Sequence, residues 1–205
     1  MDAKLLTVSG ARGAPDHSIR DQIVAAATEH FRLYGYEKTT VSDLASAIGY
    51  SKAYIYKFFD SKQAIGEVIC ANRLAEVMGA VDAAVAGATS PSDRFRRMFR
   101  AFIDAGTALF FEDRKLYDIA ATASRDAWPS VQAYERYVRE LITKIVREGR
   151  EAGEFERKTP LDETANAICL VMKPYINPLL LQYNLEGAQD ATLHLSNLVL
   201  RSLAP

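Results

Sequence analysis

The amino-terminal part of the chain divides into three helical segments, two of which are very short. Ser18 is a good N-cap residue and Gly35 a good terminator, so the first helix is expected between them. Thr40 opens a second segment that Gly49 ends after two turns, and Ser51 opens a third. Isolated helices shorter than about 12 to 15 residues are marginal in water. The two short segments must therefore pack against a neighbouring helix.

The rest of the chain also carries helical periodicity. A long fourth helix is expected to begin at Asp60 or Ser61 and to run to about residue 86, and a last helix is expected near residues 193 to 203. Three further starts combine a cap with a proline: Ser90-Pro91, Trp128-Pro129 and Thr159-Pro160. Alternating apolar runs joined by hairpin turns are absent from the sequence. We predict an all-α fold with about nine helices.

Composition excludes several classes of protein. The 205 residues are 49% hydrophobic and 25% charged, as in ordinary globular proteins, which excludes a disordered or collagen-like chain. The longest apolar stretches fall short of the roughly 20 residues of a membrane-spanning helix, and the start lacks the apolar segment of a secretory signal. Cys70 and Cys169 have no partner spacing for a disulfide or zinc site. We expect a cytoplasmic protein without metal or cofactor.

Residues that would support catalysis are not arranged for it. His17, His30 and His194 are isolated, and no HExxH motif, P-loop or recognisable nucleophile context occurs in the sequence. We therefore expect that the chain is not an enzyme. The alternative is a helical enzyme or a carrier of small molecules or lipids in which the pair of short helices is incidental.

Two short helices joined by about three residues that include a glycine are typical of a helix-turn-helix. In the third segment Ile55 and Phe59 would face the core. The outward side chains would be Lys52, Ala53, Tyr56 and Lys57. Lysines and a tyrosine hydroxyl can bind DNA phosphates, a small alanine lets a helix approach a base edge, and Ser51 with the free N–H groups of the helix start can bind a phosphate. The alternative is a solvated corner of an unrelated helical protein.

Charge is uninformative over the whole chain and informative locally. The formal net charge is −1, which gives no indication of nucleic-acid binding. Between residues 51 and 62, however, Lys52, Lys57 and Lys62 stand against Asp60 alone. Positive charge is therefore concentrated on the segment expected at the DNA, and non-specific DNA affinity is expected to be modest.

Residues 39 to 62, TTVSDLASAIGYSKAYIYKFFDSK, resemble the amino-terminal signature of the tetracycline-repressor (TetR) family of transcriptional regulators. The upstream Phe31, Gly35 and Tyr36 fit the same pattern, so the resemblance covers roughly residues 18 to 66. It implies a ligand-responsive transcription factor, most often a repressor. Such a protein would bind a pseudo-palindromic double-stranded DNA operator as a homodimer, and a small-molecule effector would release it.

The resemblance also implies roles for single residues. Together with Ser51, the positions expected at the DNA are Thr40, Lys52, Ala53, Tyr54, Tyr56, Lys57 and Lys62. Lys52, Ala53 and Tyr54 would face base edges, and the others would bind phosphates. Phe58 stands where the family often has tyrosine or histidine, so one usual phosphate contact is expected to be missing. Tyr50 replaces a smaller aliphatic residue, which leaves its orientation open.

We expect three parts: a flexible arm of residues 1–17, a DNA-binding domain of residues 18–66, and a ligand-binding and dimerisation domain of residues 67–205. Most aromatic residues of the last part would simply form its core. If a cavity lies between its helices, it would take a largely apolar or aromatic ligand. The candidate ligand-binding residues are Phe102, Trp128, Tyr134, Met172 and Tyr175.

The end of the chain carries two further signals. Pro174 and Pro178 are expected to kink the penultimate helix, either to open space for a ligand or as a plain bend, and Lys173 would pair with an acidic ligand or be solvated. Apolar residues, among them Leu193 and Leu198, surround too much of the last helix for a helix covered on one side. We predict a homodimer through a four-helix bundle of residues about 160–183 and 188–203 from each chain.

Overall fold

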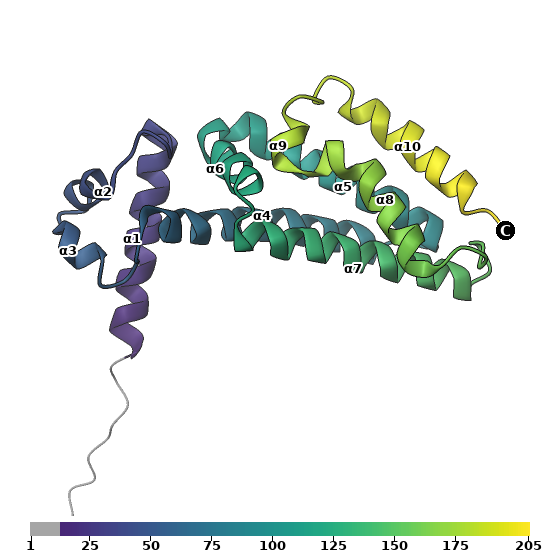
Figure 1. The fold of residues 1–205 in the computed structure, drawn as a ribbon, viewed down its shortest axis with the longest axis horizontal. Coiled ribbons are helices and arrows are strands. Elements are labelled where there is room, and N and C mark those ends of the chain that lie inside the picture. Colours follow the sequence, from purple (N-terminus) through teal and green to yellow (C-terminus); the bar gives the residue numbers. More distant parts are fainter. Residues whose placement is uncertain (1–12) are drawn as a thin grey trace, which may run out of the picture.

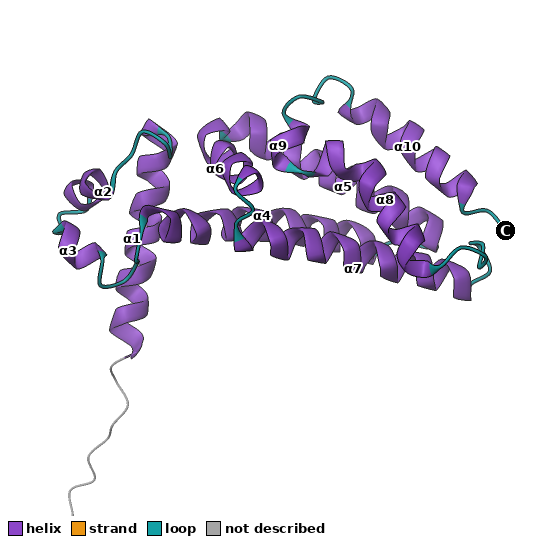
Figure 2. Ribbon diagram, viewed as in Figure 1, coloured by secondary structure: helices purple, strands orange, loops and turns teal. Residues whose placement is uncertain are grey.

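The computed structural model describes residues 13–205, and this part of the chain folds into ten α-helices without a strand (Figures 1 and 2). The helices are α1 Gly13–Tyr34, α2 Val41–Ala47, α3 Lys52–Ile55, α4 Lys62–Ala86, α5 Pro91–Glu112, α6 Arg114–Arg125, α7 Pro129–Glu151, α8 Leu161–Ile176, α9 Pro178–Leu181 and α10 Ala188–Ser202. The predicted all-α class is confirmed.

The first helix starts earlier than the sequence pattern indicates. Residues 1 to 12 of the expected arm lie outside the described residues, whereas residues 13 to 17 already belong to α1. The expected start at Ser18 is therefore wrong. Pro15 does not prevent the earlier start, because a proline in the first turn lacks only an N–H group that has no intrahelical partner there.

Helices α1 to α3 form a small head at one end of the molecule (Figure 1). Thr40 caps α2 as expected: its hydroxyl accepts the N–H of Asp43 at 3.2 Å, and the Asp43 carboxylate accepts the N–H of Thr40 at 2.8 Å. Helix α3 is shorter than expected and ends at Ile55 rather than Phe59. Beyond Ile55 the chain continues in tighter turns, in which the N–H of Lys57 bonds the carbonyl of Tyr54 at 3.2 Å.

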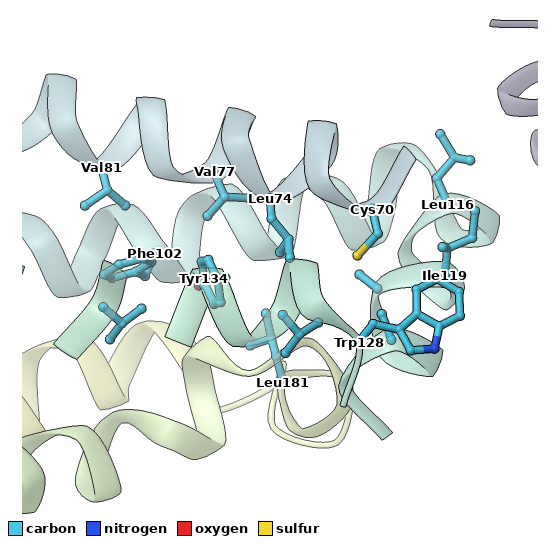
Figure 3. Close-up of a cluster of buried hydrophobic side chains, with 14 of the residues drawn as sticks. Cys70, Leu74, Val77, Val81, Phe102, Leu116, Ile119, Trp128, Tyr134 and Leu181 are labelled. Carbon is cyan, nitrogen blue, oxygen red and sulfur yellow. The ribbon is translucent and has the colours of Figure 1, made fainter. Parts of the chain in front are cut away.

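Helices α4 to α10 form a larger body, and α4 leaves the head and runs along the length of this body (Figure 1). Ser61 caps it as expected, with its hydroxyl accepting the N–H of Ala64 at 3.0 Å. Helices α5 and α7 pack along α4, α8 lies on α7, and α10 lies on α5 and α8. Figure 3 shows part of the core between them, in which Leu74, Val77 and Val81 of α4 face Phe102 and Tyr134.

The penultimate helix is broken rather than kinked at Pro178. Helix α8 ends at Ile176, and the side-chain oxygen of Asn177 caps the new helix α9 by accepting the N–H groups of Leu179 at 3.0 Å and Leu180 at 3.3 Å. Pro178 is the first residue of α9, where its missing N–H costs nothing, while Pro174 stays inside α8.

Two buried tyrosines hold this break in place. The hydroxyl of Tyr134 on α7 donates to the carbonyl of Ile176 at 3.1 Å, and the hydroxyl of Tyr117 on α6 donates to the carbonyl of Pro178. Burial raises the pKa of both phenols, which keeps them protonated as donors. The α8–α9 break is therefore a hydrogen-bonded feature with fixed partners on two other helices.

The start of α8 also differs from expectation. Pro160 rather than Thr159 occupies the N-cap, and no side chain caps this helix. The hydroxyl of Thr164 instead donates to the carbonyl of Pro160 at 2.9 Å. The cap-plus-proline pattern therefore marked the boundary correctly and misplaced the cap by one residue.

Two helical glycines provide a paired test of the packing. A Cβ atom at Gly149 of α7 would overlap the ring of Phe155, whereas one at Gly79 of α4 has nothing within 4 Å. We expect Gly149→Ala to lower the free energy of unfolding by about 1 to 3 kcal/mol. Gly79→Ala should raise it by about 0.5 to 1 kcal/mol, because alanine has the higher helix propensity. Urea unfolding followed by circular dichroism measures both, and equal effects of the two substitutions would contradict the packing described.

Candidate nucleic-acid interface

The turn between α2 and α3 sets the direction of α3. Gly49 adopts φ +71°, and the N–H of Tyr50 returns to the carbonyl of Ala45 at 2.9 Å. The Ser51 hydroxyl then accepts the N–H of Tyr54 at 3.1 Å and caps α3. Ile55 is fully buried beneath the helix. The opposite side of this segment is therefore turned to solvent.

The side chains expected to point outward do so. Lys52, Ala53 and Lys57 are exposed, and Tyr56 is 43% exposed. The Lys52 ammonium lies 5.8 Å from the ring centre of Tyr56. This face thus offers two cations, a phenol and one small side chain, the residue types that contact phosphates and base edges in DNA.

A row of aromatic rings runs beside this face. Tyr50 packs on Tyr54 with ring centres 4.7 Å apart, and Tyr54 packs on Phe58 at 5.4 Å. The Lys57 ammonium lies 5.4 Å from the ring centre of Tyr54. The orientation of Tyr50 is therefore set by its contact with Tyr54. It also follows that Tyr54, which is half-buried, offers only part of its surface to a ligand.

Thr40 is exposed, but its hydroxyl is engaged. It donates to the Asp43 carboxylate at 2.7 Å while accepting the N–H of Asp43. These bonds from the Thr40 side chain and backbone lower the pKa of Asp43 and keep it ionised. A phosphate only accepts hydrogen bonds, so a Thr40–phosphate contact requires the hydroxyl to turn away from Asp43.

Lys62 lies at the base of the head rather than on its outer face. Its ammonium donates to the carbonyls of Tyr36 at 3.0 Å and Glu37 at 3.5 Å, and it lies 4.3 Å from the ring centre of Tyr36. The side chain thus ties the loop after α1 to the start of α4. An ammonium has three N–H donors, so one donor is left for a phosphate.

The head meets the body at an aromatic junction that sequence reasoning missed. The rings of Tyr36 and Trp128 contact edge to face with centres 5.7 Å apart. A Cβ atom at Gly66 would lie 2.8 Å from Tyr36 and 3.2 Å from Trp128, so the glycine permits this contact. Burial raises the pKa of Tyr36 to about 12, which keeps its phenol neutral.

A second contact joins the end of α1 to the start of α6. Arg32 pairs with Asp113 at 2.5 Å, and the Lys115 ammonium donates to the carbonyl of Leu33. Residues so far apart in the chain carry no local pattern from which their pairing can be read. The Arg32–Asp113 hydrogen bond raises the pKa of Arg32, so the guanidinium stays charged.

The five expected ligand-binding residues do not gather around one site. Phe102 and Tyr134 pack together at 5.9 Å between ring centres, whereas Trp128 lies at the other end of the cluster, at the head junction (Figure 3). Met172 is fully buried, and the half-buried Tyr175 packs on Phe99. Tyr134 borders a pocket that lies between α7 and α8.

The described residues contain no cluster of three or more metal-ligating side chains. In the same part of the chain, no helix has the length and apolar character needed to cross a membrane.

Sequence comparison assigns both parts of the chain to one family. Residues 23–68 match the family described as bacterial regulatory proteins, tetR family, and residues 91–194 match the tetracyclin repressor-like, C-terminal domain. No curated protein matches the chain.

Solved structures share the fold. A TetR-family transcriptional regulator from Pectobacterium atrosepticum has a TM-score of 0.70 at 19% identity, over 94% of this chain and 97% of that one. A TetR/AcrR-family regulator from Thermobifida fusca gives 0.64 at 24%, over 89% and 97%. The fatty acid degradation regulator FadR from Bacillus halodurans gives 0.61 at 17%, over 95% of each chain. With both domains matched, the chain belongs to the TetR family of DNA-binding transcriptional regulators and is not an enzyme.

Proposed function

We propose that the chain is a homodimeric repressor that leaves its operator when a small, largely apolar or aromatic ligand binds the body. The observation that carries this proposal is the solvent-facing side of α3 and of the turn that follows it, where Lys52, Ala53, Tyr56 and Lys57 are presented together above a buried Ile55. Residues 18–66 would read DNA, and residues 67–205 would bind the ligand and the second subunit.

Within the head, the proposed contacts divide by chemistry. Ala53 in the first turn would let α3 approach base edges, with Lys52 and the exposed part of Tyr54 beside it. Tyr56 and Lys57 would bind phosphates, and so would Ser51. Thr40 and Lys62 would add phosphate contacts at the edges of this surface, each beside a bond it already makes within the head.

The proposed dimer uses α8 and α10. Both helices expose large apolar side chains: Leu170 is 63% exposed, Leu193 57% and Leu198 61%. A groove of about 440 Å³ also runs between the two helices, with Ile168 and Val171 on one side and Leu198 on the other. The same helices of a second copy would cover these residues and complete a four-helix bundle.

A dimer also makes DNA reading effective. One helix-turn-helix reads few base pairs, whereas two heads on a two-fold axis reach successive major grooves roughly 34 Å apart. A ligand that favours a dimer with differently spaced heads would weaken operator binding in proportion to its preference for that form.

Contacts within one chain offer a route from the body to the head. The α8–α9 break is bonded to Tyr117 of α6, and the first residues of α6 are bonded to the end of α1 through Asp113 and Lys115. A shift of the break would therefore displace α6 and, through it, the head. The Tyr36–Trp128 contact lies at the same junction and would respond to the same movement.

DNA binding is tested by fluorescence anisotropy with the intergenic DNA beside the gene, at several salt concentrations. We expect sequence-selective binding at nanomolar to micromolar protein that weakens steeply with salt. Lys57→Ala should lower the slope of the logarithm of the DNA-binding constant against the logarithm of the salt concentration by about 0.9. Its effect on stability should be small, because the Lys57 side chain is exposed and contacts only the ring of Tyr54. Lys62→Ala should lower the slope similarly and also the free energy of unfolding by about 1 kcal/mol, because two carbonyls lose their donor.

Each outcome of this experiment has a clear meaning. Absence of selective, salt-dependent binding would reject the proposed function. If the salt dependence of DNA binding were unchanged in Lys57→Ala, Lys57 would not contact a phosphate. If it were unchanged in Lys62→Ala, Lys62 would act only within the head.

The dimer is tested by sedimentation equilibrium of two matched variants. Leu198→Glu places a carboxylate in the proposed interface, and we expect it to raise the dimer dissociation constant by at least about tenfold. Leu33→Glu is the control, because Leu33 of α1 is 62% exposed and lies outside α8 and α10. If both variants had the same dimer dissociation constant as the native chain, the proposed interface would be contradicted.

A further inference from the structure

A pocket of about 130 Å³ opens between α7 and α8. Its apolar wall is formed by Tyr134, Val138, Leu170 and Ile176, with the Cys169 thiol beside them. Burial raises the pKa of Cys169, so its sulfur is a neutral thiol and adds to the apolar lining. An engineered protein cavity of about 150 Å³ holds one benzene molecule, so this space fits a single six-membered ring or a branched aliphatic group of similar size.

Two cations stand at this pocket. Arg139 comes from α7 and Lys173 from α8, and both side chains are exposed. Within the described part of the chain neither forms an ion pair; Arg139 donates to the neutral side-chain oxygen of Asn166 at 3.3 Å. One carboxylate, Glu135, also borders the pocket, so its charged groups sum to +1.

Two of the other polar groups at the pocket, the hydroxyl of Tyr134 and the side-chain oxygen of Asn177, already have partners. The Tyr134 hydroxyl donates to the carbonyl of Ile176, and the Asn177 side-chain oxygen caps α9. A ligand with a polar end would therefore find its strongest available partners in the two cations. A carboxylate matches them, because a guanidinium and an ammonium both donate charge-assisted hydrogen bonds to it.

We propose that this pocket binds a compact carboxylate of about the size of benzoate, with its ring between α7 and α8 and its carboxylate on Arg139 and Lys173. The proposal rests on the proposed function in one respect, since it makes this carboxylate the effector. The pocket borders Ile176 and Asn177, the residues of the α8–α9 break. A ligand there would contact the α8–α9 break, which is bonded to α6 through Tyr117, and α6 in turn contacts the head.

Titration calorimetry of the native chain without DNA tests the site, with benzoate and its neutral isostere benzamide as probes. We expect one benzoate per chain and at least about tenfold weaker binding of benzamide, because the amide lacks the charge that the cations recognise. The double variant Arg139→Gln, Lys173→Gln should bind benzoate as weakly as the native chain binds benzamide. The control Lys144→Gln, Arg147→Gln changes the net charge equally on exposed positions of α7 outside the pocket, and it should bind benzoate like the native chain.

Three results would overturn the proposal: no heat of benzoate binding at millimolar ligand, equal affinity for benzoate and benzamide, or unchanged benzoate affinity in the double variant. Anisotropy with operator DNA on the same preparations separates this inference from the proposed function. DNA binding without benzoate binding would refute the carboxylate site alone, whereas benzoate binding without DNA binding would refute the repressor function alone.

Discussion

The fold depends on one helix that belongs to both domains. Helix α4 buries side chains along its length, from Ile65 beneath the head to Val85 at the far end of the body. At its start, Gly66 leaves room for Tyr36 of the head and Trp128 of the body to meet against it. Because a Cβ atom at this position would collide with Tyr36, the close contact between the domains requires glycine here. The position of α3 relative to the body follows from this junction.

Polar contacts also join the two domains. Arg32 and Asp113 join α1 to α6, and Lys62 ties the loop after α1 to α4. A partly exposed ion pair contributes little to stability, so the aromatic contact around Gly66 holds the two domains together more strongly than the Arg32–Asp113 pair.

Much of the fold was predictable from local chemistry. The caps Thr40, Ser51, Ser61 and Ser90 stand where the sequence places them, because a cap bonds an N–H group two or three residues away. The exposed face of α3 followed from the same local pattern. Errors arose where several signals compete, as at Asn177, whose side chain starts a new helix beside Pro178 instead of leaving a kink.

Long-range contacts were not predictable in this way. The fate of Trp128 depends on Tyr36 and Gly66, and no spacing in the chain relates these residues. The candidate ligand-binding residues are mostly buried in the core, and periodicity predicts that a side chain is buried without predicting which cavity it borders. Lys62 had the right position for a phosphate contact, but its carbonyl partners become visible only once the loop after α1 is folded.

We propose that the bodies of a dimer hold the two heads at a fixed separation. Electron–electron double resonance between two nitroxide labels measures this separation. The label is attached at Ser42→Cys, an exposed position of α2, in a Cys169→Ser variant whose remaining cysteine, Cys70, is buried. We predict one narrow distance distribution for the labelled chain that retains Trp128. The Trp128→Ala variant, which lacks the ring that packs on Tyr36, should give a broad distribution. If the distribution were as broad with Trp128 as in Trp128→Ala, or if no dipolar coupling were observed, two heads at a fixed separation would be contradicted.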